Sequence, residues 1–332
     1  MNNKKIIAGL SALIIVLAIF IVSEKLGDKK PSENEVKFFP GLDDKSISSL
    51  VIKEGTNSVK LSRKGEEWMV SKVADTTDSN SIKEKSYKAD SASVQIALEK
   101  LTSMKKGDLI SENPQNQPTF QVDSLSGTFV EIWKGDDASA GAIRIGKNGP
   151  DWNSNYVRKL GSNSVFTVPG GLRYSLFSEL DRWRDKKIMK FESSAAQKIE
   201  LVKKEGSITI EKADSGWVLT QPIQHKASAD KVNEIINTLS ALKAAEFVYE
   251  TPSDTASGMN SPALLATVSL NGGAERKVVI GKTKGESNLY WTKVEGNEEF
   301  FLIGKSDMDK IDVDAESLKA VEDSTSKATE AK

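Results

Sequence analysis

The sequence contains the same series of landmarks twice, and this constrains the fold more than any other feature. Two stretches, residues 89–110 and 228–248, each have apolar residues at helical spacing followed by a short apolar segment. Leu98 corresponds to Ile236 and Leu101 to Leu239, at a constant offset of 138 residues. Since any helix that faces a core shows apolar residues three and four apart, the helices alone do not establish a repeat.

Landmarks outside the helices establish the repeat. Upstream, Trp68 in "EEWMV" corresponds to Trp217 in "SGWVL", each after an alternating strand pattern. Downstream, "IRIGK" at 143–147 corresponds to "VVIGK" at 278–282, and both are followed by an "SN" segment that contains Tyr. Loops of different length absorb the drift in offset, because the entropy of loop closure rises slowly with loop length. We therefore predict a tandem duplication, with repeats at residues 46–170 and 196–311.

Each repeat reads as short period-two strands in runs, with one amphipathic helix between them. This order predicts an α+β fold in which an antiparallel sheet is combined with a helix, and the unit is used twice. A linking helix is predicted at residues 171–195, from the apolar residues Leu172, Leu176, Leu180 and Trp183. The glycines of the two "IGK" segments, Gly146 and Gly281, are expected to permit tight turns after a strand.

The N-terminus combines Lys4 and Lys5 with an uncharged apolar run from Ile6 to Val22. A run of this length predicts a transmembrane helix within residues 1–23, and a cleaved secretory signal is the competing interpretation. The absence of a small-x-small cleavage pattern after the run favours a retained anchor. Residues 24–45 are then expected to be a polar tether, and residues 312–332 a solvated, disordered tail.

Composition excludes several classes of chemistry. The net charge is −1, with 46 basic and 47 acidic residues, so no overall field favours nucleic acid. The chain contains no Cys, which excludes thiolate metal sites and a Cys nucleophile. Lys282 follows a strand as in a phosphate loop, but Arg276 replaces the first glycine of that motif. The single histidine, His225, has no partner motif, so we predict no catalytic, cofactor-binding or metal-binding residues.

The tryptophans fall into two groups. Trp68 and Trp217 occupy equivalent strand positions and are expected in the two cores. Trp133, Trp152 and Trp291 lie near strand ends and turns. Packing at a domain edge is the first interpretation for these three, and contact with a carbohydrate or a partner protein is the second.

Three segments carry a family resemblance: the stretch from Trp217 to Phe247, the "IGK" block with its following "YW", and the linker "LDRWRDKKIMKFE". In these segments the chain resembles the bacterial family catalogued as domain of unknown function 4340. The resemblance implies a membrane-anchored, extracytoplasmic protein that accompanies an ABC-type transport system of the kind linked to gliding motility. It implies no catalytic residue.

Two functions remain open from the sequence. The first is a non-catalytic accessory protein, a single-pass protein of the cell membrane with most of the chain outside. Its expected partners, by the resemblance, are an ABC permease and its ATPase. The second is an extracytoplasmic enzyme that acts on envelope glycans through a pair of carboxyl groups.

Overall fold

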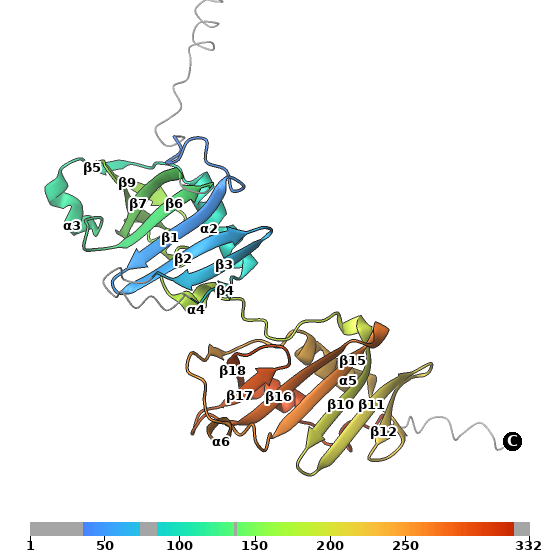
Figure 1. The fold of residues 1–332 in the computed structure, drawn as a ribbon. Coiled ribbons are helices and arrows are strands. Elements are labelled where there is room, and N and C mark those ends of the chain that lie inside the picture. Colours follow the sequence, from blue (N-terminus) through green and yellow to red (C-terminus); the bar gives the residue numbers. More distant parts are fainter. Residues whose placement is uncertain (1–35, 74–84, 136–137, 322–332) are drawn as a thin grey trace, which may run out of the picture. The chain divides into compact units, whose positions relative to one another are not determined.

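The structure is a computed structural model that describes residues 36–73, 85–135 and 138–321. The predicted anchor between Ile6 and Val22 lies outside these residues. Within the described part, no helix is long and apolar enough to cross a membrane. The chain divides into two compact units, residues 1–184 and 185–332, and each is described by itself below (Figure 1).

The first unit is built on an antiparallel sheet of nine strands within the described residues. Its spatial order is β4 (Tyr87–Lys88), β3 (Glu67–Lys72), β2 (Asn57–Lys64), β1 (Ile47–Glu54), β6 (Thr128–Lys134), β7 (Ala138–Asn148), β8 (Ser154–Lys159), β9 (Val165–Pro169) and β5 (Leu109–Ser111). Alternate strand residues are buried, as expected for a sheet with one face against a core. Helix α2 (Ser91–Ser103) follows β4 in the chain and contributes Val94, Leu98 and Leu101 to that core.

The second unit repeats this topology strand for strand. Its sheet has the order β13 (His225–Lys226), β12 (Gly216–Gln221), β11 (Gly206–Ala213), β10 (Ala196–Lys203), β15 (Leu264–Leu270), β16 (Glu275–Thr283), β17 (Leu289–Val294), β18 (Phe300–Gly304) and β14 (Glu246–Phe247). Helix α5 (Ala229–Ser240) takes the place of α2 and buries Val232, Ile236 and Leu239. The two antiparallel sheets therefore form a repeated arrangement (Figure 1).

Trp68 and Trp217 occupy the same place in the two units. Each is the second residue of its strand, β3 or β12, and each is largely buried. A cation lies across from each ring on the neighbouring strand: Arg63 is 4.9 Å from the Trp68 ring centre, and Lys212 is 6.0 Å from the Trp217 ring centre. The carbonyl of each Trp accepts a hydrogen bond from the alanine just before the helix, Ala89 or Ala227.

The repeat extends further toward the N-terminus of each unit than the sequence indicated. Phe38 N–H donates to the Met104 carbonyl, and Ile188 N–H donates in the same way to Leu242, in both cases at 2.9 Å. Phe38 and Phe39 are buried in the first core. Residues 36–45 therefore pack onto the first unit and do not belong to the tether that the sequence predicts for residues 24–45.

The repeat also extends toward the C-terminus of each unit. Asp90 N–H donates to the Trp183 carbonyl at 2.7 Å, and Ser228 N–H donates to the Leu318 carbonyl at 2.8 Å. Leu318 is fully buried in the second core. The segment 312–321, which was expected to be a solvated tail, is thus the counterpart of the segment that closes the first unit at Trp183.

The long linking helix predicted at residues 171–195 is wrong. The structure has a 3-10 turn, η3 (Leu172–Tyr174), one turn of helix, α4 (Leu180–Trp183), and a second 3-10 turn, η4 (Ser193–Ala195). The four apolar residues that suggested a helix are buried in the first core. The backbone around Trp183 pairs with residues 89 and 90 instead of with its own previous turn, which prevents a continuous helix.

Gly146 and Gly281 lie inside strands β7 and β16 and do not form turns. A Cβ at Gly146 would lie 2.0 Å from the Phe120 carbonyl oxygen, at the end of α3 (Gln117–Phe120). A Cβ at Gly281 would lie 2.0 Å from the Ser257 carbonyl oxygen, at the end of α6 (Asp254–Ser257). Each glycine thus allows a short helix to pack directly on the strand.

Candidate functional site

Two loops of the first unit meet beside the end of β7. Residues 149–153 connect β7 to β8, and residues 170–171 lead from β9 into η3. The Asn153 carbonyl accepts hydrogen bonds from the N–H groups of Gly170, at 2.7 Å, and Gly171, at 2.9 Å. Gly171 has φ 58°, and a Cβ there would press against the Tyr174 ring at 3.1 Å. The two loops are therefore joined through their backbones.

Trp152 is held in an unusual conformation in the first of these loops. Its φ is 59°, in the left-handed region that costs a residue with a side chain about 1–2 kcal/mol. The residue is nevertheless 79% exposed, so packing of the ring offsets little of that cost. Tyr174, at the end of η3 in the joined loop, is 70% exposed. Together they place two solvent-facing aromatic rings on adjacent loops.

Asp151 fixes the loop that carries Trp152. Its Oδ1 accepts hydrogen bonds from the Ser154 N–H, at 2.8 Å, and from the Ser154 hydroxyl. The hydroxyl bond is the main reason that the pKa of Asp151 lies below its usual value. The Gly149 N–H donates to the Ser154 carbonyl at 2.9 Å and closes the loop. The rings are thus presented on a hydrogen-bonded scaffold.

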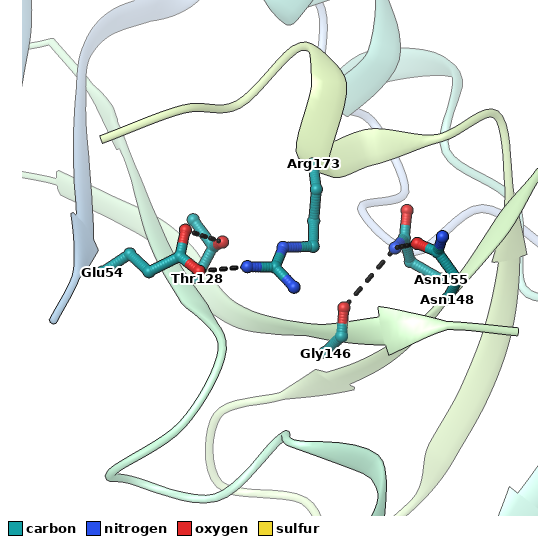
Figure 2. A network of polar contacts seen from close by, with 6 residues as sticks. All are labelled: Glu54, Thr128, Gly146, Asn148, Asn155 and Arg173. Atoms are coloured by element: carbon teal, nitrogen blue, oxygen red, sulfur yellow. Dashed lines mark hydrogen bonds and ion pairs between the residues drawn. The ribbon is translucent and has the colours of Figure 1, made fainter. Parts of the chain in front are cut away.

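A polar pocket of about 410 Å³ opens next to these loops. Figure 2 shows the Arg173 side chain reaching down from η3, with Glu54 and Thr128 on one side and Asn148 and Asn155 on the other. Arg173 forms an ion pair with Glu54 Oε1, and the Thr128 hydroxyl donates to Glu54 Oε2 at 2.9 Å. The pocket is lined by Glu54, Asn57, Asn148, Arg173, Tyr174, Phe177, Ser178, Glu179 and Arg182.

Asn155 contacts Asn148 of the pocket lining and is almost completely buried. Its side-chain N–H₂ donates to the Gly146 carbonyl at 3.4 Å and to Asn148 Oδ1 at 3.2 Å (Figure 2). Its Oδ1 has no hydrogen-bond partner among the described residues. The two donated bonds tie Asn148, a residue of the pocket lining, to strands β7 and β8.

The charges that line the pocket balance. Glu54 and Glu179 contribute two carboxylates, and Arg173 and Arg182 contribute two guanidinium groups. The Arg182 guanidinium lies 3.9 Å from the centre of the Phe177 ring, which positions it by a cation–π contact. The lining therefore offers several donors and acceptors without a net charge.

The second unit does not reproduce this site. By the strand registers, Lys203 corresponds to Glu54 and Leu264 to Thr128. In the same way, Thr283 corresponds to Asn148 and Tyr290 to Asn155. Lys203, at the end of β10, forms an ion pair with Asp312. The counterpart at the end of β1 is the pair of Glu54 with Arg173, in which the strand residue carries the opposite charge. The loop between β16 and β17 has the same length as the loop of Trp152, and Ser287 occupies the tryptophan position. The aromatic and polar groups are thus specific to the first unit.

The residues singled out from the sequence lie elsewhere, with one exception. Lys282 lies within strand β16, beside the glycine that packs on α6, and not in a loop that leads into a helix. His225 is on a sheet edge, with Nδ1 2.8 Å from the Lys226 carbonyl oxygen. Trp133 and Trp291 lie within β6 and β17 and are half-buried. Trp152 is the exception, because its loop is hydrogen-bonded through Asn153 to the segment that leads into Arg173 and Tyr174 of the pocket lining.

The polar residues near the loop of Trp152, above all Arg173, Tyr174 and Asn148, are not predicted from the sequence. A residue-by-residue comparison of the two repeats would have indicated Asn148, because the aligned position in the second repeat is Thr283. Among the described residues, no group of three or more His, Cys, Asp or Glu side chains could hold a metal ion.

Comparison with known proteins gives one result. No curated protein and no solved structure matches the chain. A family model described as "Domain of unknown function" (DUF4340) matches residues 80–262. The match spans more than half of the chain and includes helix α2, the loops of Trp152 and Tyr174, and helix α5. On this match, the chain belongs to the DUF4340 family of domains of unknown function.

Proposed function

We propose that this protein is a membrane-anchored, extracytoplasmic accessory protein of an ABC-type transport system or envelope machine. It acts by binding other molecules and performs no catalysis of its own. The apolar run from Ile6 to Val22 serves as the anchor in this proposal, and the two units lie outside the membrane.

The observation that carries the binding role is the divergence between two units of the same topology. Both units keep the sheet order, the buried helix face and the paired Trp68 and Trp217. They differ in the solvent-facing groups at the β7–β8 loop and its counterpart. A fold that is kept while an exposed surface changes is typical of a scaffold for recognition, because function resides in sites placed on a fold.

Glu54, one of the two carboxyl groups that line the pocket, supports binding more than glycan hydrolysis. Glu54 has one oxygen engaged by Arg173 and the other by the Thr128 hydroxyl. A hydrolase needs one carboxyl group to protonate the leaving group and another to attack or to activate water. Glu54 is instead positioned to hold Arg173, which favours the accessory function over the enzyme.

Transport requires parts that other chains must supply. A single apolar run cannot enclose a pathway across a bilayer, and the Lys282 segment has Arg276 in place of the first phosphate-loop glycine. A permease and an ATPase are therefore the proposed partners. Tethering at the membrane would raise the local concentration of the units near such a complex, so weak contacts would suffice.

Crosslinking in cells, followed by gentle detergent extraction and affinity purification, tests this proposal. We expect recovery of an ABC permease together with its ATPase. A matched control replaces residues 6–22 with an unrelated transmembrane segment, which keeps the tether but removes specific contacts within the bilayer. Recovery should persist with that control and fall sharply when residues 1–23 are deleted. Recovery of neither subunit, under conditions that capture other membrane complexes, would contradict the proposal.

A further inference from the structure

We infer that the first unit binds a neutral saccharide, with Trp152 and Tyr174 stacking on sugar rings and the Arg173 pocket receiving hydroxyl groups. This inference concerns a ligand of the chain itself, and it does not depend on the identity of the proposed transport partners.

The second unit shows that the loop does not need a tryptophan in order to fold. Lys284 N–H donates to the Leu289 carbonyl at 2.8 Å, and Ser287 N–H donates to the Lys284 carbonyl at 3.1 Å. The loop of Trp152 has the same two bonds between the corresponding positions. The left-handed residue is Gly285 in this loop and Trp152 in the other, so the two backbones differ in detail. Because the same two bonds form with Ser287 at the tryptophan position, they do not require the large apolar side chain of Trp152.

The joined segment shows the same difference. In the second unit, Lys305 N–H donates to the Asn288 carbonyl at 2.8 Å, as Gly170 does to Asn153 in the first unit. The residues that follow form helix α7 (Lys305–Ile311), whose outer face carries an ion pair between Lys305 and Asp309 at 2.6 Å. The first unit has Tyr174 in this region, with most of its ring exposed. Both aromatic residues thus occur where the other unit has polar ones.

Exposed rings on a rigid scaffold suit a ligand that has an apolar face. A pyranose ring presents C–H groups on one face, and the negative face of an aromatic ring attracts such groups. Because hydrogen bonds through Asp151 and Asn153 hold the loops, little conformational entropy is lost when a ligand binds. The left-handed backbone at Trp152 fits this role, since strain of this kind concentrates at functional sites.

The pocket suits the hydroxyl groups of the same ligand. Each hydroxyl both donates and accepts, and the lining offers donors through Arg182 and acceptors through Glu179, while Arg173 and Glu54 are paired with each other. The two positive and two negative charges cancel, which gives no net attraction for an anion. A few directed polar groups beside apolar rings are typical of a small-molecule site. The chemistry therefore indicates a neutral, polyhydroxylated ring.

Titration of the purified full chain with saccharides tests the inference. The detergent must have no sugar headgroup, since such a headgroup would compete. The probes are maltotetraose, cellotetraose and chitotetraose, with tetragalacturonate as an anionic comparison. Calorimetry and tryptophan fluorescence report binding. We expect at least one neutral tetrasaccharide to bind more tightly than the anionic one, with a change in the emission of Trp152.

Variants assign the binding to the site. Trp152→Ala and Tyr174→Ala should each weaken binding about tenfold, the scale of one lost aromatic contact. Trp152→Phe keeps a ring and should retain most of the affinity by calorimetry while losing the emission change. The matched control is Leu125→Ala, which removes a 94% exposed apolar side chain from the same unit and should change nothing.

Three outcomes would overturn the inference. The first is that no neutral tetrasaccharide binds at millimolar concentration, with thermal unfolding showing that the protein is folded. The second is binding that Trp152→Ala and Tyr174→Ala leave unchanged. The third is loss of crosslinked membrane partners in Trp152→Ala without any saccharide binding, which would identify the rings as a protein contact. Saccharide binding without ABC partners would leave this inference standing and contradict the proposed function alone.

Discussion

At the scale of single residues, Trp152 shows what a sequence can and cannot indicate. Trp133, Trp152 and Trp291 look alike in the sequence, each near the end of a strand pattern. The structure separates them, because Trp133 and Trp291 are half-buried within strands whereas Trp152 is 79% exposed on a loop. Exposure depends on what packs against a loop, and local residue patterns do not contain that information.

The backbone at Trp152 leads to a stability prediction. Glycine adopts a positive φ without the steric cost of a Cβ. The free energy of unfolding of Trp152→Gly should therefore be about 1 kcal/mol larger than that of Trp152→Ala, which means a more stable protein. Both variants lack the ring, so their difference isolates the backbone term. Urea denaturation measures it. A glycine variant no more stable than the alanine variant would show that the left-handed conformation carries no strain.

At the scale of elements, the sequence predicted the long, periodic segments and the short strands that follow the two helices, and it missed other short elements such as β4 and β13. The runs that became β1, β2 and β3, and the helices α2 and α5, follow clear periods of two and 3.6 residues. Strands β4, β5, β13 and β14 have only two or three residues, and they exist because a neighbouring strand pairs with them. The predicted linking helix failed for a related reason, since pairing with residues 89 and 90 outweighed its apolar period.

The glycines of β7 and β16 provide a test at this scale. Gly146→Ala and Gly281→Ala each place a Cβ 2.0 Å from a helix carbonyl oxygen, so each should destabilise its unit by about 1–3 kcal/mol. Gly304→Ala is the matched control, because Gly304 has no atom within 4 Å of an added Cβ and no positive φ. Thermal unfolding of the three variants measures the effect. Equal stability of all three would contradict the close packing of α3 and α6 on these strands.

At the scale of the whole molecule, the duplication could be predicted but its limits could not. The matching landmarks all lie within 46–170 and 196–311, where strand and helix periods make them visible. The segments that complete each unit, around Phe38 and Trp183 in the first and around Ile188 and Leu318 in the second, share little sequence. They correspond through backbone hydrogen bonds, which place few demands on side-chain identity.

The C-terminal segment of the second unit allows the last prediction. Leu318 is fully buried in the second core, and its carbonyl accepts from Ser228 at the start of α5. Leu318→Ala should therefore destabilise the second unit by about 2–5 kcal/mol, as expected for a buried leucine. Val321→Ala is the control, because Val321 lies three residues further along and is 96% exposed.

Hydrogen exchange followed by mass spectrometry resolves which unit responds. The cores of the two units consist of separate sets of residues, so Leu318→Ala should speed exchange in β10 to β18 and leave β1 to β9 unchanged. A solvated tail would give the opposite result, since removing an exposed side chain has little effect on stability. Unchanged exchange in the second unit would show that residues 312–321 are part of a solvated tail. The second repeat would then end at Ile311.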